Sequence, residues 1–114
     1  MLTVEALRAR GANVDEGLAR CFGNEAFYLR MVRMGLEDPN FDRLEAARRA
    51  GDAPAAFEAA HALKGSVGNL SLTPLYAPVC AITELLRSRS DMPEFDALYA
   101  ELTAALAEFR ALAE

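Results

Sequence analysis

Several residue types that support common protein functions are scarce in this sequence. Its 114 residues include two cysteines, one histidine and no tryptophan, and only one of the 12 basic residues is a lysine. Cys21 and Cys80 are too few and too far apart for a disulfide framework or a zinc knuckle, so we expect reduced thiols. One histidine does not supply a His-rich metal site, and little supports a mixed His–Cys–carboxylate site.

Long apolar runs and a positive charge balance are also missing. No apolar segment approaches the roughly 20 residues that span a bilayer, and no basic region followed by an apolar stretch opens the chain. The formal net charge is −5, with arginines scattered among acids, whereas a nucleic-acid binder needs a basic face. We therefore expect a cytoplasmic monomer that binds neither membranes nor nucleic acids.

The residues that are abundant indicate a helical protein. Hydrophobic residues make up 53% of the chain, many of them alanine and leucine, and charged residues 25%. No segment has the pattern of a strand, and there is no repeat or linker. Residues 1–114 are therefore predicted to form a single all-α domain. The starting methionine and the lack of a linker favour a free-standing domain over one cut from a larger protein, and both remain open. The expected fold is an antiparallel four-helix bundle with short additional N-terminal helices.

Caps and breakers set the expected helix boundaries. Four residues are N-cap candidates, one before each of four helices: Asn13, Asn24, Asn40 and Asp52. Glu16 lies three residues after the first of them and completes a capping-box-like pattern. Pro78 removes an amide donor one turn after Pro74, so an irregular first turn is predicted there. The helices are expected over about 14–22, 25–38, 40–50, 53–70, 74–87 and, after "SRSD", 92–114.

The only histidine and the only lysine lie one helical turn apart, in "HALKG", residues 61–65. At about 100° per residue, His61 lies opposite an apolar stripe and is predicted to be exposed. The stripe consists of Ala56, Ala59, Leu63, Val67 and Leu70. Lys64 is within reach of the imidazole, and Phe57 precedes it by one turn. Gly65 and Gly68 leave space beside the ring, although each glycine costs a helix interior about 1 kcal/mol. Two interpretations of this face are possible: an imidazole that acquires negative charge, or a solvated face whose glycines serve helix packing. The combination favours the first.

The segment "AHALKGSVGNL" resembles the signature of histidine-containing phosphotransfer (HPt) domains of bacterial multistep phosphorelays, A-H-x-L-K-G-S/A-x-x-N-L/I-G. The upstream segment "NVDEGLARCFGNEAFYLRMV" is similar to the stretch that precedes this signature, so the resemblance covers about residues 11–72. It implies a four-helix bundle with an exposed phospho-accepting histidine on the second bundle helix. Ser71, where the family usually has glycine, and Pro78 depart from the pattern. Both lie about three turns or more from His61 and so bear on packing more than on chemistry.

The resemblance also implies a role for each residue of the exposed face. His61 would be phosphorylated, Lys64 would stabilise the phosphoryl group, and Gly65 would let a receiver domain approach. Phe57 and Gly68 would contact that partner. The chain would carry phosphoryl groups between aspartates of response-regulator receivers or a hybrid histidine kinase, without kinase activity or a cofactor of its own. Mg²⁺ would be bound by the receiver.

Two alternatives and one ambiguous helix remain. A non-catalytic helical adaptor (pseudo-HPt) would bind a partner through the same face, but such a protein typically loses the histidine. A Cys–His hydrolase would need Cys21 or Cys80 beside His61, and neither cysteine has features of an activated thiolate.

In the helix over 25–38, apolar residues cover about 220° of the circumference. This helix is either enclosed between the bundle and the N-terminal helices or forms, with Phe57, an apolar rim for docking.

Overall fold

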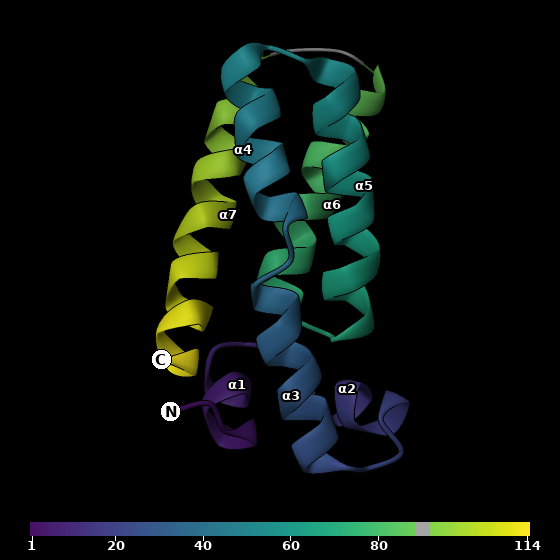
Figure 1. Cartoon of the computed structure of the whole chain (residues 1–114), viewed down its shortest axis with the longest axis vertical. Coiled ribbons are helices and arrows are strands. Elements are labelled where there is room, and N and C mark those ends of the chain that lie inside the picture. The colour runs from purple at the N-terminus through teal and green to yellow at the C-terminus, as the bar shows by residue number, and fades with distance from the viewer. Residues whose placement is uncertain (89–91) are drawn as a thin grey trace.

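The chain is all-α, as predicted. The computed structural model describes residues 1–88 and 92–114, which contain seven helices and no strand (Figure 1). The helices are α1 (Val4–Ala9), α2 (Val14–Arg20), α3 (Glu25–Leu36), α4 (Asn40–Ala50), α5 (Ala53–Asn69), α6 (Thr73–Ser88) and α7 (Met92–Ala113). The predicted "SRSD" link lies outside the described residues, except for Ser88.

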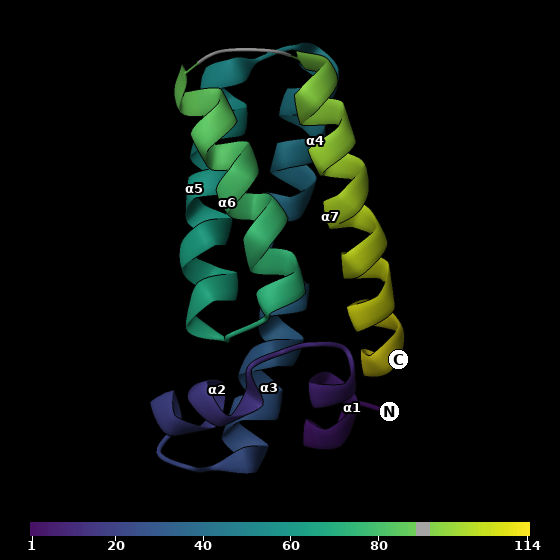
Figure 2. The same ribbon diagram turned by 180° about the vertical axis from the view of Figure 1, so that it is seen from behind.

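Four of these helices form the predicted antiparallel bundle. Helices α4, α5, α6 and α7 run alternately up and down the long axis, and α3 continues the line of α4 beyond the end of the bundle (Figures 1 and 2). The short helices α1 and α2 lie across the end at which α5 leads into α6 (Figure 2). The principal extents are 40 × 23 × 20 Å, so the N-terminal helices lengthen the bundle rather than widen it.

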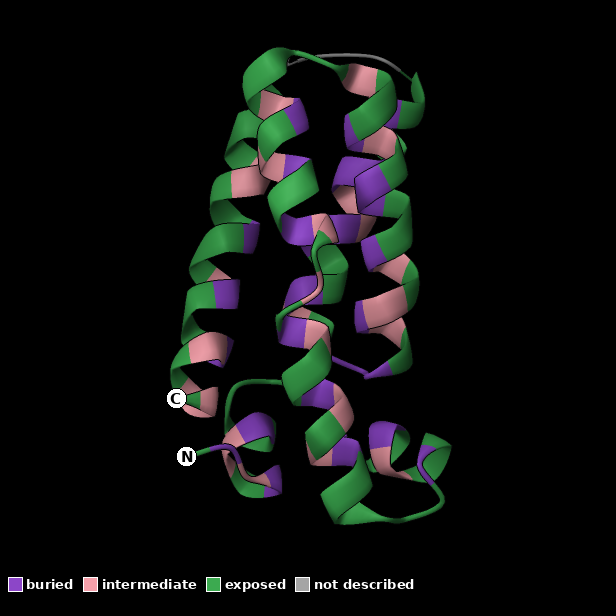
Figure 3. Ribbon diagram, viewed as in Figure 1, coloured by how far each residue is buried: buried purple, intermediate pink, exposed green. Residues whose placement is uncertain are grey.

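Each bundle helix buries one apolar stripe. On α5 the buried residues are Ala56, Ala59, Ala60, Leu63 and Val67, which includes nearly all of the predicted stripe. The alanines are small, so α4 and α6 can pack closely against this side of α5. Figure 3 shows the buried positions facing inward and the exposed positions facing solvent. Because the stripe faces the core, the opposite face of α5 is left free for function.

The wide apolar surface predicted over 25–38 is divided between core and solvent. Tyr28, Val32 and Leu36 are buried, whereas Phe27 is 39% and Met34 60% exposed. The Tyr28 hydroxyl donates to the Leu70 carbonyl at 2.9 Å, and burial raises the pKa of Tyr28 to about 12. The helix is therefore enclosed on one side and leaves two large apolar side chains exposed on the other.

Three of the four predicted N-caps are confirmed. The side chains of Asn13, Asn24 and Asp52 each accept the amide N–H three residues later. The prediction for Asn40 is wrong, because Asn40 is the first residue of α4 and its N–H donates to Asp38 Oδ1 at 2.8 Å. Pro39 already has helical backbone angles, so the helix begins one residue earlier than a cap at Asn40 would allow.

The irregular first turn predicted at Pro78 is also wrong. Helix α6 runs without interruption from Thr73 to Ser88, with Pro78 inside it. The missing amide leaves one carbonyl, that of Pro74 in the first turn, without its usual helical partner. The Pro78 ring is buried in the core, and this burial compensates for the lost hydrogen bond.

Candidate functional site

The helix α5 carries His61 near its middle, on the side away from the core. Asp52 caps the helix by accepting the Ala55 N–H at 3.1 Å, and Pro54 occupies its first turn. Both features fix where the helix begins and therefore which residues face the core. His61 is exposed, as predicted from the apolar stripe on the opposite side.

The Phe57 ring lies next to the imidazole, and Arg87 lies next to the Phe57 ring. The rings of Phe57 and His61 are stacked, with centroids 5.8 Å apart and planes inclined by 29°. The guanidinium carbon of Arg87, on α6, lies 5.3 Å from the Phe57 ring centroid. Phe57 is half-buried against the core rather than fully solvated. The imidazole therefore contacts a ring that is itself anchored to two helices.

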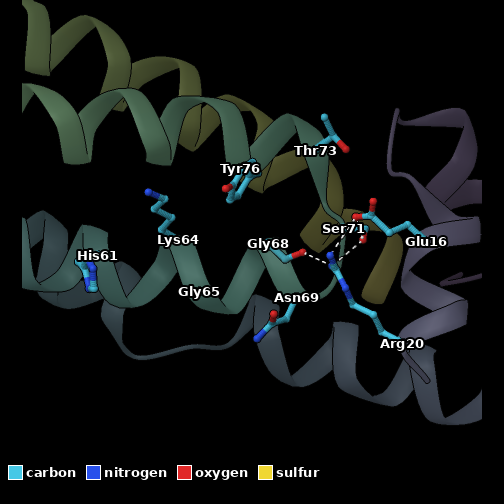
Figure 4. A pocket seen from close by; sticks show the side chains of 10 residues that line it. All are labelled: Glu16, Arg20, His61, Lys64, Gly65, Gly68, Asn69, Ser71, Thr73 and Tyr76. Carbon is cyan, nitrogen blue, oxygen red and sulfur yellow. Dashed lines mark hydrogen bonds and ion pairs between the residues drawn. The ribbon is translucent and has the colours of Figure 1, made fainter. Parts of the chain in front are cut away.

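A groove of about 490 Å³ extends from His61 toward the C-terminal end of α5 (Figure 4). Ten residues of α2, α5, the turn after α5 and α6 line it: Glu16, Arg20, His61, Lys64, Gly65, Gly68, Asn69, Ser71, Thr73 and Tyr76. Four of the five residues predicted for the site thus lie in one groove: His61, Lys64, Gly65 and Gly68. Phe57 lies just beyond the groove, on the other side of His61.

The two glycines predicted to open this face have different surroundings. A Cβ built on Gly65 meets no atom within 4 Å, so this glycine borders open space. A Cβ on Gly68 would lie 2.9 Å from Cε1 of Tyr76, so the absence of a side chain at Gly68 lets the tyrosine ring pack on α5. Internal packing accounts for Gly68, whereas no internal contact accounts for Gly65. The partner contact expected of Gly68 stays a prediction.

At its far end the groove is closed by a polar cluster that joins α2 to the end of α5. Arg20 Nη1 donates to the Gly68 carbonyl at 2.6 Å and to Ser71 Oγ at 3.1 Å (Figure 4). Ser71 Oγ in turn donates to Glu16 Oε1 at 2.7 Å. Ser71 has φ +58°, a left-handed conformation that favours glycine. These hydrogen bonds compensate for the strain of a serine at this position.

The charges in the groove are not all neutralised. Arg20 forms an ion pair with Glu16 at 3.4 Å, whereas Lys64 has no ion-pair partner among the described residues. The side chain of Lys64 extends over the groove (Figure 4). The position of Lys64 one turn from His61 makes its ammonium the available cation for negative charge that arrives at the imidazole.

A family model for the Hpt domain matches residues 36–112, which is more than half of the chain. The chain belongs to the Hpt domain family. Hpt domains are phosphocarrier modules that act in histidine phosphotransfer within phosphorelays, where they interact with receiver domains and kinases. The matched range contains all five predicted site residues. No curated protein and no solved structure matches the chain.

Sequence reasoning missed the part of the groove that the N-terminal segment provides. Glu16 and Arg20 lie outside the residues matched to the Hpt domain, and nothing in the sequence of α2 indicates that they face α5. Their i, i+4 spacing places them on one side of a helix but does not say which helix they meet. Tyr76 was missed too, and the neighbouring Cys80 side chain raises the pKa of the Tyr76 hydroxyl above its usual value.

The remaining expectations concern metals, membranes and the cysteines. The described residues of the Hpt chain contain no group of three or more His, Cys, Asp or Glu side chains that could hold a metal ion. Within the same residues, no helix has the length and apolarity needed to cross a membrane. Cys21 is buried, and neither it nor Cys80 lines the groove or forms a hydrogen bond with His61. The geometry thus gives no support to a Cys–His hydrolase.

Proposed function

We propose that this Hpt domain accepts a phosphoryl group on His61 from the aspartyl phosphate of one receiver domain and passes it to the aspartate of another. The observation that carries the proposal is the placement of the only histidine, which is exposed in the middle of α5. Beside it lies Gly65, a position that borders open space. An incoming domain can therefore reach the imidazole without displacing any part of the chain.

The chemistry needs only a neutral imidazole nitrogen and an activated phosphoryl group. In the first transfer the nitrogen lone pair forms a P–N bond while the P–O bond to the aspartate breaks, and the carboxylate keeps the electron pair of that bond. In the second transfer an aspartate oxygen attacks phosphorus and the imidazole leaves. Such transfers are catalysed mainly by positioning and charge stabilisation, so no general base is required of this chain.

Lys64 and Gly65 have distinct parts in this proposal. The unpaired ammonium of Lys64 stabilises the negative charge that the phosphoryl group brings to the groove. Gly65 keeps the approach to His61 free of side-chain atoms. The Mg²⁺ that assists transfer is supplied by the receiver, and the chain acts as a carrier without kinase activity of its own.

The partner is a receiver domain, either of a response regulator or of a hybrid histidine kinase. Apolar side chains lie on both sides of the His61 face, and they fit the apolar rim that such docking uses. Tyr76 is 38% exposed on the α6 side, and Met34 lines a separate groove with Ser66 and Asn69 on the α3 side. Phe57 and Gly68 complete the contact surface around His61.

The test is label transfer from a phosphorylated receiver to the wild-type protein and to His61→Gln. We expect the variant to accept no label and to keep its stability within about 0.5 kcal/mol, because an exposed polar exchange rarely changes stability more. Label on the wild-type protein should be lost in acid, as phosphohistidine is and phosphoserine is not.

The matched control is Glu58→Gln, one turn before His61 on the same helix and also exposed. This variant should accept label at the wild-type rate. Acid-labile label on His61→Gln would contradict the proposal. Binding of the receiver without any label on the wild-type protein would instead favour the adaptor function.

A further inference from the structure

Three side chains from two helices form a continuous contact that includes His61. Phe57 and His61 lie four residues apart on α5, and their rings are stacked at a centroid distance of 5.8 Å. Arg87, near the end of α6, places its guanidinium carbon 5.3 Å from the centroid of the same phenyl ring. The ring distance lies within the range in which aromatic pairs attract, and the second distance fits a cation–π contact.

Exposure alone would leave the imidazole without a fixed orientation. An exposed histidine exchanges between side-chain rotamers, and only some of them direct a ring nitrogen toward an incoming phosphorus atom. Among the described residues, His61 has no hydrogen-bond partner that would select one rotamer. Among the same residues, the stacked Phe57 ring is a contact that could select one.

Phe57 is suited to this task because it is held in place itself. Its side chain is half-buried and packs against the hydrophobic core. Arg87 holds it from α6, and the Arg87 Nε forms an ion pair with Glu84 Oε1 at 3.5 Å. The ring thus packs on the core and contacts an arginine of α6.

We propose that Phe57, braced by Arg87, is a positioning residue that sets the orientation of the His61 imidazole. The effect of Phe57 on phosphoryl transfer rests on the proposed function, whereas its effect on the orientation of the imidazole does not depend on that function. A docking contact would act on how tightly the receiver binds. A positioning residue acts on the maximal transfer rate in the complex, because it changes the fraction of complexes with a correctly directed nitrogen.

The first arm of the test is NMR of the imidazole, which needs no partner. His61 is the only histidine, so its ring C–H signals are identified without ambiguity. In Phe57→Leu we expect these signals to lose the ring-current shift from the phenyl ring and to show greater side-chain mobility. Phe57→Tyr retains the ring and should restore both properties, and Arg87→Gln should lose them in part.

The second arm measures transfer from a phosphorylated receiver over a range of receiver concentrations. We expect Phe57→Leu to lower the maximal transfer rate constant about two- to tenfold, the range that one aromatic pair supports. The half-saturating receiver concentration should change little, because leucine keeps an apolar side chain for docking. Phe57→Tyr should be close to wild type. The control is Phe41→Leu, which removes a phenyl ring 5.5 Å from the Arg110 guanidinium at a site remote from His61. This control should lose stability, because Phe41 is buried, but should keep the wild-type maximal rate constant.

The outcomes separate this inference from the proposed function. Unchanged imidazole signals in Phe57→Leu would overturn the inference, whatever the transfer assay gives. A raised half-saturating receiver concentration with an unchanged maximal rate constant would overturn it as well, because Phe57 would then serve docking alone. A wild-type protein that takes no label would refute the proposed function, and the NMR arm would still decide whether Phe57 orients His61.

Discussion

Gly65 allows stability and phosphoryl transfer to be measured against each other in one substitution. Glycine in a helix interior is less favourable than alanine by about 1 kcal/mol. The Cβ of an alanine at this position meets no atom of the described residues within 4 Å, so none of them opposes that gain. We therefore expect Gly65→Ala to raise the melting temperature by roughly 4 °C for a domain of this size.

Transfer should change in the opposite direction. If Gly65 is the opening through which a receiver reaches His61, each added carbon occupies space that the partner needs. The rate of transfer from a phosphorylated receiver should fall from glycine to alanine to leucine. A small phosphoryl donor such as phosphoramidate needs much less room, and its reaction with His61 should be nearly unaffected by the alanine.

Gly17 provides the matched control for stability. A Cβ on this residue would lie 2.5 Å from Cε1 of Tyr28, whose side chain is fully buried. Gly17→Ala should therefore lower stability by about 1–3 kcal/mol in spite of its better helix propensity. Thermal unfolding followed by circular dichroism measures both variants.

Two results would refute the reasoning on Gly65. A lower melting temperature for Gly65→Ala would mean that the glycine serves internal packing, as Gly68 does with Tyr76. Wild-type transfer from a receiver to Gly65→Leu would mean that no partner passes over this position. Either result would remove Gly65 from the docking surface.

Two further predictions concern a charge and a buried hydroxyl. Lys64→Ala should shorten the lifetime of the phosphorylated protein or slow its formation by about fivefold, because one partly solvated cation contributes on the order of 1 kcal/mol. The effect should be smaller at high salt, and the decay of the label measures it. A wild-type lifetime would mean that Lys64 is only a solvated side chain. Burial raises the pKa of Tyr28 to about 12 from 10.0, so the folded state holds this proton more tightly than the unfolded state. The contribution of this group to the free energy of unfolding is fully present below about pH 10 and should fall by up to roughly 2–3 kcal/mol toward pH 12, which urea unfolding measures. Tyr28→Phe should lack this part of the decline. An equal decline in the variant would contradict the assignment.

The sequence by itself determined the direction in which His61 points and six of the seven described helices, all but α1. Caps at Asn13, Asn24 and Asp52 and the left-handed Gly51 act within a few residues, so they can be recognised without the fold. The apolar stripe of α5 repeats with the period of a helix, which decides the buried side and therefore the exposed side. Together with the spacing of the signature, these local features located the candidate site.

Only the tertiary structure decided what surrounds that site. The capping box expected from Asn13 and Glu16 is half formed. Asn13 Oδ1 accepts the Glu16 N–H, but the Glu16 carboxylate accepts from Ser71 Oγ instead of from the Asn13 N–H. The contact of Arg87 with Phe57 was also decided by the tertiary structure, because it depends on how α6 lies along α5.

The two glycines beside His61 show the same limit. Gly65 and Gly68 lie on the same face of a helical wheel, and their surroundings differ because Tyr76 of α6 packs on Gly68 and not on Gly65. Such contacts join segments that are distant in the chain. Helical periodicity gives the face on which a residue lies, but the residue that it meets depends on how whole helices pack.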